Sequence, residues 1–149
     1  MAARSSGVNL DSRFDFNNNF YKKEKFKPLK ANGDVYSRFK LRYKEVKDSI
    51  DFIKDFLKEL KNHQQENLKT NVNNNLKENS FIVSIVEGWR GEIVHIAITG
   101  QNNELLRYKI KDASFNNWFM LSLAVRNNGI SDFPLCNKSF NLSYCGFDL

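Results

Sequence analysis

The fold class of this chain is decided by the stretch FIVSIVEGWRGEIVHIAIT, residues 81–99. It contains two apolar runs rich in β-branched residues, at 81–86 and 92–99, on either side of a short segment with two glycines. A third run at 105–110 follows the turn signal Gly100-Gln101-Asn102-Asn103. Short apolar runs between glycine-containing turns are typical of strands joined as hairpins. The stretch therefore predicts a small antiparallel sheet.

Upstream of the sheet, apolar residues recur with the period of a helix. Asn32-Gly33-Asp34 combines a turn with a helix N-cap at Asp34. Alternating steps of four and three residues separate the apolar positions that follow, which are Phe39, Tyr43, Val46, Ile50, Ile53, Leu57 and Leu60. This spacing places them on one stripe of a helix of about seven turns. We interpret the stripe as the core-facing side of an amphipathic helix, which must pack on another surface.

A second helix and an apolar tail follow the strands. Ser114 is the predicted N-cap of a helix through Trp118 and Leu121, and Asn127-Asn128-Gly129 is typical of a left-handed C-cap. Residues 130–149 have no regular period but are rich in large apolar side chains, so we expect this tail to insert into a core. The expected fold class is α+β, with a long amphipathic helix, a small antiparallel sheet, a second helix and an apolar tail.

The whole chain is expected to form a single domain. Its 149 residues, 41% of them hydrophobic, are enough for one core but too few for two. Residues 1–32 lack a sustained period and are predicted to form an extended arm. Residues 62–80 are rich in asparagine and have no hydrophobic period, so we expect a long exposed loop or a locally disordered insert there.

Composition argues against several classes of protein. The apolar run at 81–86 stops at Glu87, far short of the roughly 20 residues of a membrane-spanning helix. The first residues lack the apolar region of a secretory signal, so we expect a cytosolic compartment. Two cysteines, Cys136 and Cys145, do not make a disulfide framework, and we interpret them as reduced thiols.

Residue spacing supports neither a metal site nor a catalytic nucleophile. The candidate ligands are His63, His95, Cys136 and Cys145, and no two of them have a CxxC or HxxxH spacing. A cysteine and a histidine in a chain of this size are more often unrelated than a catalytic pair. The sequence also has no glycine-rich phosphate loop.

The net charge of +6 comes with a lysine-rich cluster that has two possible roles. The largest cationic cluster, at residues 21–30, includes Lys22 and Lys30 and interleaves lysines with aromatic residues. Basic modules bind nucleic acid with such a pattern, but an arm that packs its rings and solvates its lysines has it too. We favour the arm, because no helix-turn-helix, zinc-finger or ribonucleoprotein motif accompanies the charge.

The segment Glu87-Gly88-Trp89-Arg90-Gly91-Glu92 is unusual because two glycines bracket a Trp-Arg pair between two apolar strands. Its glycines allow a tight turn that aims Arg90 into a pocket, where Glu87 or Glu92 could hold the guanidinium. Equally, Arg90 could close a surface salt bridge at a hairpin corner. The composition of the segment favours neither role over the other.

This segment, followed by His95, resembles the Glu-Ala-Pro-Arg-Gly segment and downstream histidine of nickel-iron hydrogenase large subunits. It is also similar to the Glu-Ser-Pro-Arg-Gly-Glu segment of the quinone-side subunit of respiratory complex I. Three further blocks resemble that subunit in the same order, namely residues 4–8 with Asp11 and Arg13, residues 33–39 with Arg42, and residues 108–115. The resemblance is strongest to the energy-converting branch, which includes large subunits of the hydrogenase-4 and formate-hydrogenlyase types.

The resemblance implies a chain without nickel ligands. Catalytic members hold nickel with two Cys-x-x-Cys pairs, the second in a closing Asp-Pro-Cys-x-x-Cys segment, because thiolates stabilise a redox-active metal. Here Ser143 and Gly146 stand where the second cysteine pair would be, and Cys145 lies off the pattern. The matching blocks belong to the C-terminal part of the family, so we expect a C-terminal region or one half of a split subunit, without the first cysteine pair.

The resemblance further implies a function, a site and partners. Glu87, Arg90 and His95 match cavity-lining positions, where Arg90 would either polarise a quinone-like acceptor or tie the cavity together. The chain would shape a redox cavity in a membrane-associated, energy-converting oxidoreductase complex of the hydrogenase or NADH-quinone oxidoreductase type, without activity alone. Its expected partners are the N-terminal half of the large subunit, a small subunit that carries an iron–sulfur cluster, and membrane-arm subunits, at the cytoplasmic side of the membrane. We expect no cofactor in this chain and no nucleic-acid partner, and an isolated chain that oligomerises through exposed apolar stripes.

Overall fold

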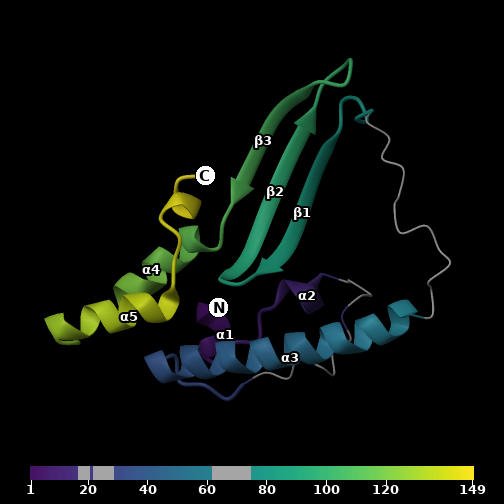
Figure 1. Cartoon of the computed structure of the whole chain (residues 1–149). Helices are drawn as coiled ribbons and strands as arrows, with labels where there is room; N and C mark the ends of the chain where they lie inside the picture. The colour runs from purple at the N-terminus through teal and green to yellow at the C-terminus, as the bar shows by residue number, and fades with distance from the viewer. Residues whose placement is uncertain (17–20, 22–28, 62–74) are drawn as a thin grey trace.

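A computed structural model describes residues 1–16, 21, 29–61 and 75–149 of the chain. The elements are α1 (Ala2–Ser5), α2 (Ser12–Asp15), α3 (Val35–Lys61), β1 (Phe81–Gly88), β2 (Gly91–Thr99), β3 (Leu105–Lys111), α4 (Ser114–Ala124), η2 (Ile130–Asp132), α5 (Phe133–Phe140) and η3 (Cys145–Phe147). The α+β class is therefore confirmed. One end of the sheet lies against α1 and α2, and the other end projects away from the helices (Figure 1).

The three strands form one antiparallel sheet in the order β1-β2-β3, as the sequence predicts. β1 and β2 run in register from Phe81↔Ile98 to Gly88↔Gly91, so only Trp89 and Arg90 form the turn. Gly91 has φ +135°, a conformation that L side chains rarely adopt, so the turn requires glycine there. The neighbouring residues Phe81 and Ile82 point to opposite faces and are 65% and 64% exposed, so neither face is covered at this end of the sheet.

The long helix α3 has the predicted length, but it buries a different face from the predicted one. Asp34 caps it, because Ser37 N donates to Asp34 Oδ1 at 2.6 Å. The side chains it buries are Ser37, Arg38 and Leu41, which face α1 and α5. The apolar stripe, defined as Phe39, Tyr43, Val46, Ile50, Ile53, Leu57 and Leu60, is 37% to 64% exposed. The stripe, which the sequence predicts to pack on another surface, is therefore not covered by the described part of this chain.

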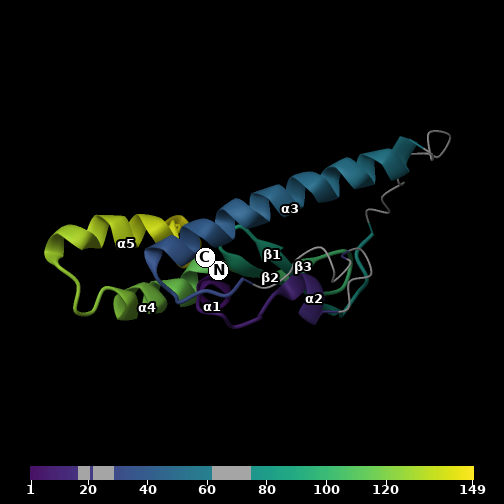
Figure 2. The same cartoon turned by 90° about the horizontal axis from the view of Figure 1, so that it is seen from below.

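The apolar core lies where α4 and α5 pack together beside the beginning of α3 (Figure 2). Leu121, Cys136 and Phe140 form its centre. Ser114 is not the N-cap of α4, because Ala113 occupies that position and the helix begins at Ser114. Ser114 N donates to Asp112 Oδ1 at 2.8 Å. The fully buried Ser114 hydroxyl instead accepts from Ser143 N at 3.0 Å and so holds the C-terminal segment against α4.

The C-terminal tail is more regular and less buried than predicted. It forms α5 between two 3-10 turns. Pro134 lies in the first turn of the helix, where the backbone N–H that proline lacks would have no intrahelical hydrogen bond. Phe140 is 3% exposed, but Ile130 is 96% exposed, and Leu135 and Tyr144 are also exposed. The tail has two apolar faces and the described part of the chain covers one of them, so the tail enters the core only in part.

The N-terminal segment is not a plain extended arm, because α1 and α2 each form one helical turn. Asp11 caps α2 by accepting from Arg13 N at 3.1 Å. The rest of the predicted arm at 17–20 and 22–28, including Lys22, lies outside the described residues, as does most of the Asn-rich loop at 62–74. At the described end of that loop, Asn79 adopts a left-handed conformation before β1.

Candidate functional site

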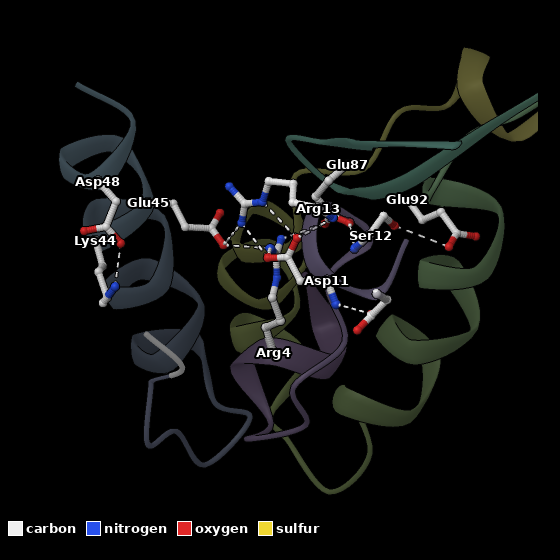
Figure 3. A network of polar contacts seen from close by, with 10 residues as sticks. Arg4, Asp11, Ser12, Arg13, Lys44, Glu45, Asp48, Glu87 and Glu92 are labelled. Carbon is white, nitrogen blue, oxygen red and sulfur yellow. Dashed lines mark hydrogen bonds and ion pairs between the residues drawn. The ribbon is translucent and has the colours of Figure 1, made fainter. Parts of the chain in front are cut away.

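Five charged side chains from four parts of the chain converge under the β1–β2 hairpin. Arg4 comes from α1, Asp11 and Arg13 from the start of α2, Glu45 from α3, and Glu87 from the end of β1 (Figure 3). We call this group the ion cluster. Its side chains are only 6% to 15% exposed. Buried charges of this kind are stable only when they are paired and hydrogen-bonded.

Arg4 is at the centre of the ion cluster. Its Nη1 lies 2.5 Å from Asp11 Oδ2 and 3.1 Å from Glu45 Oε1, and its Nη2 lies 2.8 Å from Glu87 Oε1. One guanidinium thus joins α1, α3 and the hairpin. Arg supports such an arrangement because its planar fork presents several donors in fixed directions.

Arg13 binds Asp11 as a two-pronged pair. Its Nε and Nη2 donate to the two carboxylate oxygens of Asp11 at 2.8 and 2.6 Å. Arg13 Nη2 also lies 3.7 Å from Glu45 Oε1. Glu87 accepts from Ser12 N at 3.2 Å through its second oxygen. The three carboxylates therefore share two guanidinium groups, and α2 is held to β1 by a backbone contact as well as by charge.

Burial and pairing shift the pKa values of two of these carboxyls in opposite directions. Burial alone would raise the pKa of Asp11, but hydrogen bonds from Arg13 and the charge of Arg4 outweigh it and bring the pKa below its ordinary value. For Glu45, burial outweighs the charges of Arg4 and Arg13 and raises the pKa above its ordinary value. Asp11 is thus held as a carboxylate more firmly than Glu45.

Asp11→Asn is expected to lower the free energy of unfolding at pH 7 by about 1.5–3 kcal/mol, the value of hydrogen bonds to a charged group. Asparagine keeps the N-cap of α2, so the change removes mainly the charge. The folded-state pKa of Asp11 is lowered, so the extra stability of wild type over the variant is fully present above pH 3.8, the ordinary pKa. This extra stability is lost as pH falls through the lower folded-state pKa. Urea unfolding at a series of pH values measures this; a difference that is constant down to acid pH would contradict it.

Glu45→Gln is the contrasting variant for the same measurement. The folded-state pKa of Glu45 is raised, so its carboxyl stabilises the fold most below the ordinary value of 4.5. That contribution is lost as pH rises through the raised pKa. The stability of Glu45→Gln relative to wild type should therefore increase with pH, opposite in sign to Asp11→Asn.

The residues that the sequence singled out lie in three different surroundings. Glu87 belongs to the ion cluster, whereas the Nε of Arg90 donates to the backbone oxygen of Asn141 in the C-terminal segment. Asn117 on α4 also donates to the backbone oxygen of Arg90, at 3.0 Å. Glu87 does not hold the guanidinium of Arg90. His95 lies further along β2, where it hydrogen-bonds the hydroxyl of Tyr108 on β3.

Two clefts flank the ion cluster and meet at Glu87. One, of about 230 Å³, is lined by Glu87, Arg90 and Glu92 together with α1, α2 and the start of α4. The other, of about 340 Å³, lies between the hairpin and the apolar stripe, with Trp89 on its wall. The structure thus brings Glu87 and Arg90 to one cleft. His95 lines neither of these two clefts.

Comparison with known proteins places the chain in a family. The model of the family described as "Respiratory-chain NADH dehydrogenase, 49 Kd subunit" matches residues 1–83, more than half of the chain. The chain belongs to this family. The match contains four members of the ion cluster, Arg4, Asp11, Arg13 and Glu45, and ends four residues before Glu87.

Three curated relatives of this chain are two hydrogenase components and one formate hydrogenlyase subunit. The chain is 35% identical over 114 residues to hydrogenase-4 component G of Escherichia coli (strain K12). The aligned residues make up 76% of this chain and 20% of that protein. It is 34% identical over 64 residues to formate hydrogenlyase subunit 5 of the same strain, 43% of this chain and 11% of that protein. To the membrane-bound hydrogenase subunit alpha of Pyrococcus furiosus it is 29% identical over 156 residues, 93% of this chain and 36% of that protein. The chain thus spans about a fifth of the first relative and about a third of the last.

Membership of the 49 kDa-subunit family confirms the resemblance that the four sequence blocks indicated. The comparisons give no support to the nucleic-acid alternative, and most of its lysine cluster lies outside the described residues. Within the described ranges, no helix is both long and apolar enough to cross a bilayer.

Ser143 and Gly146, where the family resemblance would place a cysteine pair, do not have surroundings that fit a nickel site. The Ser143 hydroxyl accepts from Gly146 N at 3.0 Å. A Cβ at Gly146 would lie 2.8 Å from the Asp112 carboxyl carbon, so a cysteine there would force that side chain to move. In the described part of the chain, no three His, Cys, Asp or Glu side chains gather closely enough to hold a metal ion.

Sequence reasoning missed most of the ion cluster. Arg4, Asp11 and Arg13 lie in the first block of the family resemblance, but no site role was predicted for them, and Glu45 lies in none of the blocks. One signal was available, which is the use of arginine in a chain whose positive charge is mostly lysine. Arginine suits buried, multiply bonded positions and lysine suits solvated ones.

Proposed function

We propose that this chain is part of the large subunit of a membrane-associated, energy-converting oxidoreductase complex. In that assembly its hairpin shapes a redox cavity, and its exposed apolar faces dock neighbouring parts of the subunit and other subunits. Membership of the 49 kDa-subunit family and the hydrogenase relatives support this proposal. The chain spans only part of those relatives, so we propose a structural contribution to electron transfer and no activity of the chain alone.

The observation that carries this proposal is the ion cluster under the hairpin. Arg4 binds carboxylates from three other parts of the chain and so holds the β1–β2 turn against the helices. The turn is short and is followed directly by a glycine of positive φ, so it has few alternative conformations. Arg90 is therefore presented at the edge of a cleft by a rigid support, which is what a preorganised electrostatic site requires.

The exposed apolar surfaces support the docking role. The apolar stripe of α3, both faces of the free end of the sheet and one side of α5 are uncovered in the chain. Apolar surfaces of such extent mark contacts with other proteins or membranes. The partners that we propose are the N-terminal half of the large subunit, a small subunit that carries an iron–sulfur cluster, and membrane-arm subunits, with the chain peripheral on the cytoplasmic side.

Co-purification tests this function. The tagged chain is expressed with the proteins encoded beside its gene, the membranes are solubilised, and the eluted complex is analysed for iron, acid-labile sulfide and nickel. We expect the chain to elute with membrane proteins and an iron–sulfur subunit, and without nickel bound to this chain. Elution as a free chain, with no partner bound, would disprove the proposed role.

Arg90→Ala tests the role of the cleft in that complex. We expect assembly to persist and electron-transfer turnover to fall by at least about tenfold, because the variant removes a preorganised charge at the cleft. Turnover per assembled complex is the quantity to measure, so that a loss of complex is not mistaken for a loss of rate. Arg90→Lys should recover part of the rate.

Arg126→Ala is the matched control, because Arg126 is exposed after α4 and lines neither of the two clefts. It should leave turnover unchanged. If Arg90→Ala reduces the amount of complex but leaves turnover per complex normal, Arg90 acts only through its bond to Asn141. The cavity role would then be wrong.

A further inference from the structure

The apolar stripe of α3 repeats with the spacing of a coiled-coil seam. Steps of four and three residues run without interruption from Phe39 to Leu60, so the stripe occupies alternate a and d positions of a heptad. At 100° per residue, it is centred roughly 150° around the helix from the buried Leu41. The seam therefore faces away from the side of α3 that this chain buries.

One edge of the seam carries only lysine. The e positions, each directly after a d residue, are Lys40, Lys47, Lys54 and Lys61. We call them the lysine row, and all four are exposed. Lys47 lies over the ring of Tyr43 at 4.7 Å, and Lys54 lies 3.7 Å from Asp51 in an exposed ion pair. Exposed pairs of this kind contribute little, so the row can still bind carboxylates of another chain.

The other edge of the seam is a wall of the 340 Å³ cleft. Val46, Ile50 and Ile53 line this cleft on the helix side, and Gly88 and Trp89 line it on the hairpin side. Trp89 is 47% exposed, so the cleft is open along the seam. The middle of the seam thus lies in a groove between the hairpin and the lysine row. An elongated apolar element fits there better than a flat surface.

The charges indicate which occupant the groove accepts. A second copy of α3 would place lysine against lysine in an antiparallel pair, and against Arg42, Ser49 or Phe56 at the g positions in a parallel pair. Neither arrangement gives the lysine row a carboxylate. An anionic membrane is disfavoured because Asp51, Asp55 and Glu59 lie beyond the row on the same helix.

We propose that the groove between α3 and the hairpin binds an amphipathic helix from a partner chain, whose apolar seam is bordered by carboxylates that pair with the lysine row. This inference rests on the docking role proposed above and adds the chemistry of the docked element. Like-charge contacts oppose other occupants, so the row supplies specificity more than affinity.

Two designed peptides test the charge requirement. Each is about three heptads long with leucine at a and d, and one has glutamate, the other lysine, at both e and g. Like charges at e and g keep each peptide from pairing with itself. We expect the glutamate peptide to bind the purified chain at least about fivefold more tightly than the lysine peptide, given the modest strength of exposed pairs. Fluorescence of Trp89 reports the binding, and Trp89→Phe identifies its signal.

Charge reversal provides the sharper comparison. The variant K40E/K47E/K54E/K61E should invert the preference, so that the lysine peptide binds more tightly. The control K77E/K109E/K111E/K138E has the same net charge, and its exposed positions lie outside α3. It should keep the preference of wild type. Circular dichroism of both variants checks that the helices are retained.

Three outcomes of the binding experiments would overturn the proposal. They are equal binding of both peptides, the same loss of preference in the control variant, and binding to phosphatidylglycerol vesicles in place of the peptides. Dimerisation of the free chain through α3, detected by sedimentation and unaffected by the glutamate peptide, would also overturn it. None of these outcomes bears on co-purification with the iron–sulfur subunit, so the proposed function and this inference fail separately.

Discussion

Arg4→Met is expected to lower the free energy of unfolding by about 3–5 kcal/mol, the usual cost of removing one partner from a buried ion pair. Arg4 is 8% exposed and contacts the carboxylates of Asp11, Glu45 and Glu87. Methionine keeps much of the length of the side chain but takes the central guanidinium away from these three carboxylates. The hairpin should also lose its tie to α1, so the loss should appear in hydrogen exchange at the β1–β2 turn as well.

Urea unfolding at pH 7 measures the effect. Arg126→Met, at an exposed position, is the control and should change stability by less than about 0.5 kcal/mol. The double variant Arg4→Met with Glu87→Gln should recover part of the loss, because it removes one of the uncompensated carboxylates. If Arg4→Met costs no more than Arg126→Met, the ion cluster does not stabilise the fold.

Phe140→Ala is the second large effect, with an expected loss of about 3–5 kcal/mol in the free energy of unfolding. Phe140 is 3% exposed and packs with Leu121 and Cys136 between α4 and α5. The guanidinium of Arg38 lies 4.2 Å from the centre of its ring, so the ring also covers a buried charge on α3. Alanine would leave a cavity and remove the surface on which α3 and α5 meet.

Phe133→Ala is the matched control for this change. Phe133 lies on the same helix, has the same side chain and is 48% exposed. Its truncation should cost less than about 1 kcal/mol, in proportion to the smaller area it removes from contact. Thermal unfolding of both variants gives the comparison. Equal losses would mean that the core between α4 and α5 is not the stabilising centre of the chain.

The sheet was predictable from sequence because its signals are local. Apolar alternation, β-branched residues and glycine-containing turns act within a few residues of chain, and they gave three strands whose observed bounds differ from the predicted ones by two residues or fewer. The α3 N-cap at Asp34 was predictable for the same reason, since its side chain bonds the backbone of Ser37. The bounds of the strands and the N-cap of α3 therefore do not depend on tertiary packing.

The face that α3 buries was not predictable from its own pattern. The helical period was correct, but the period locates an apolar face without saying which chain covers it. Here the chain buries Ser37, Arg38 and Leu41 and leaves the apolar stripe exposed. Arg38 is buried because it bonds Ser139 and the backbone of Gly33, neither of which a helical period can reveal.

The ion cluster shows the same limit for the candidate site. The local sequence offered Glu87 or Glu92 as the carboxylate that holds Arg90, but the structure pairs Glu87 with Arg4 and Arg90 with Asn141. Arg4 and Glu87 are 83 residues apart along the chain (87 minus 4), and Arg90 and Asn141 are 51 residues apart (141 minus 90). Pairing over such separations depends on how the elements pack.

The α+β class, the three strands, the long helix and the family follow from the amino-acid sequence alone, because they depend on local periodicity and on residue identities within short blocks. The carboxylates that the arginines bind, the position of the core and the apolar faces that stay uncovered depend instead on how the elements pack. Local propensity acts over a few residues, whereas the pairing of buried charges is set by desolvation, which brings together whichever opposite charges the folded chain removes from water.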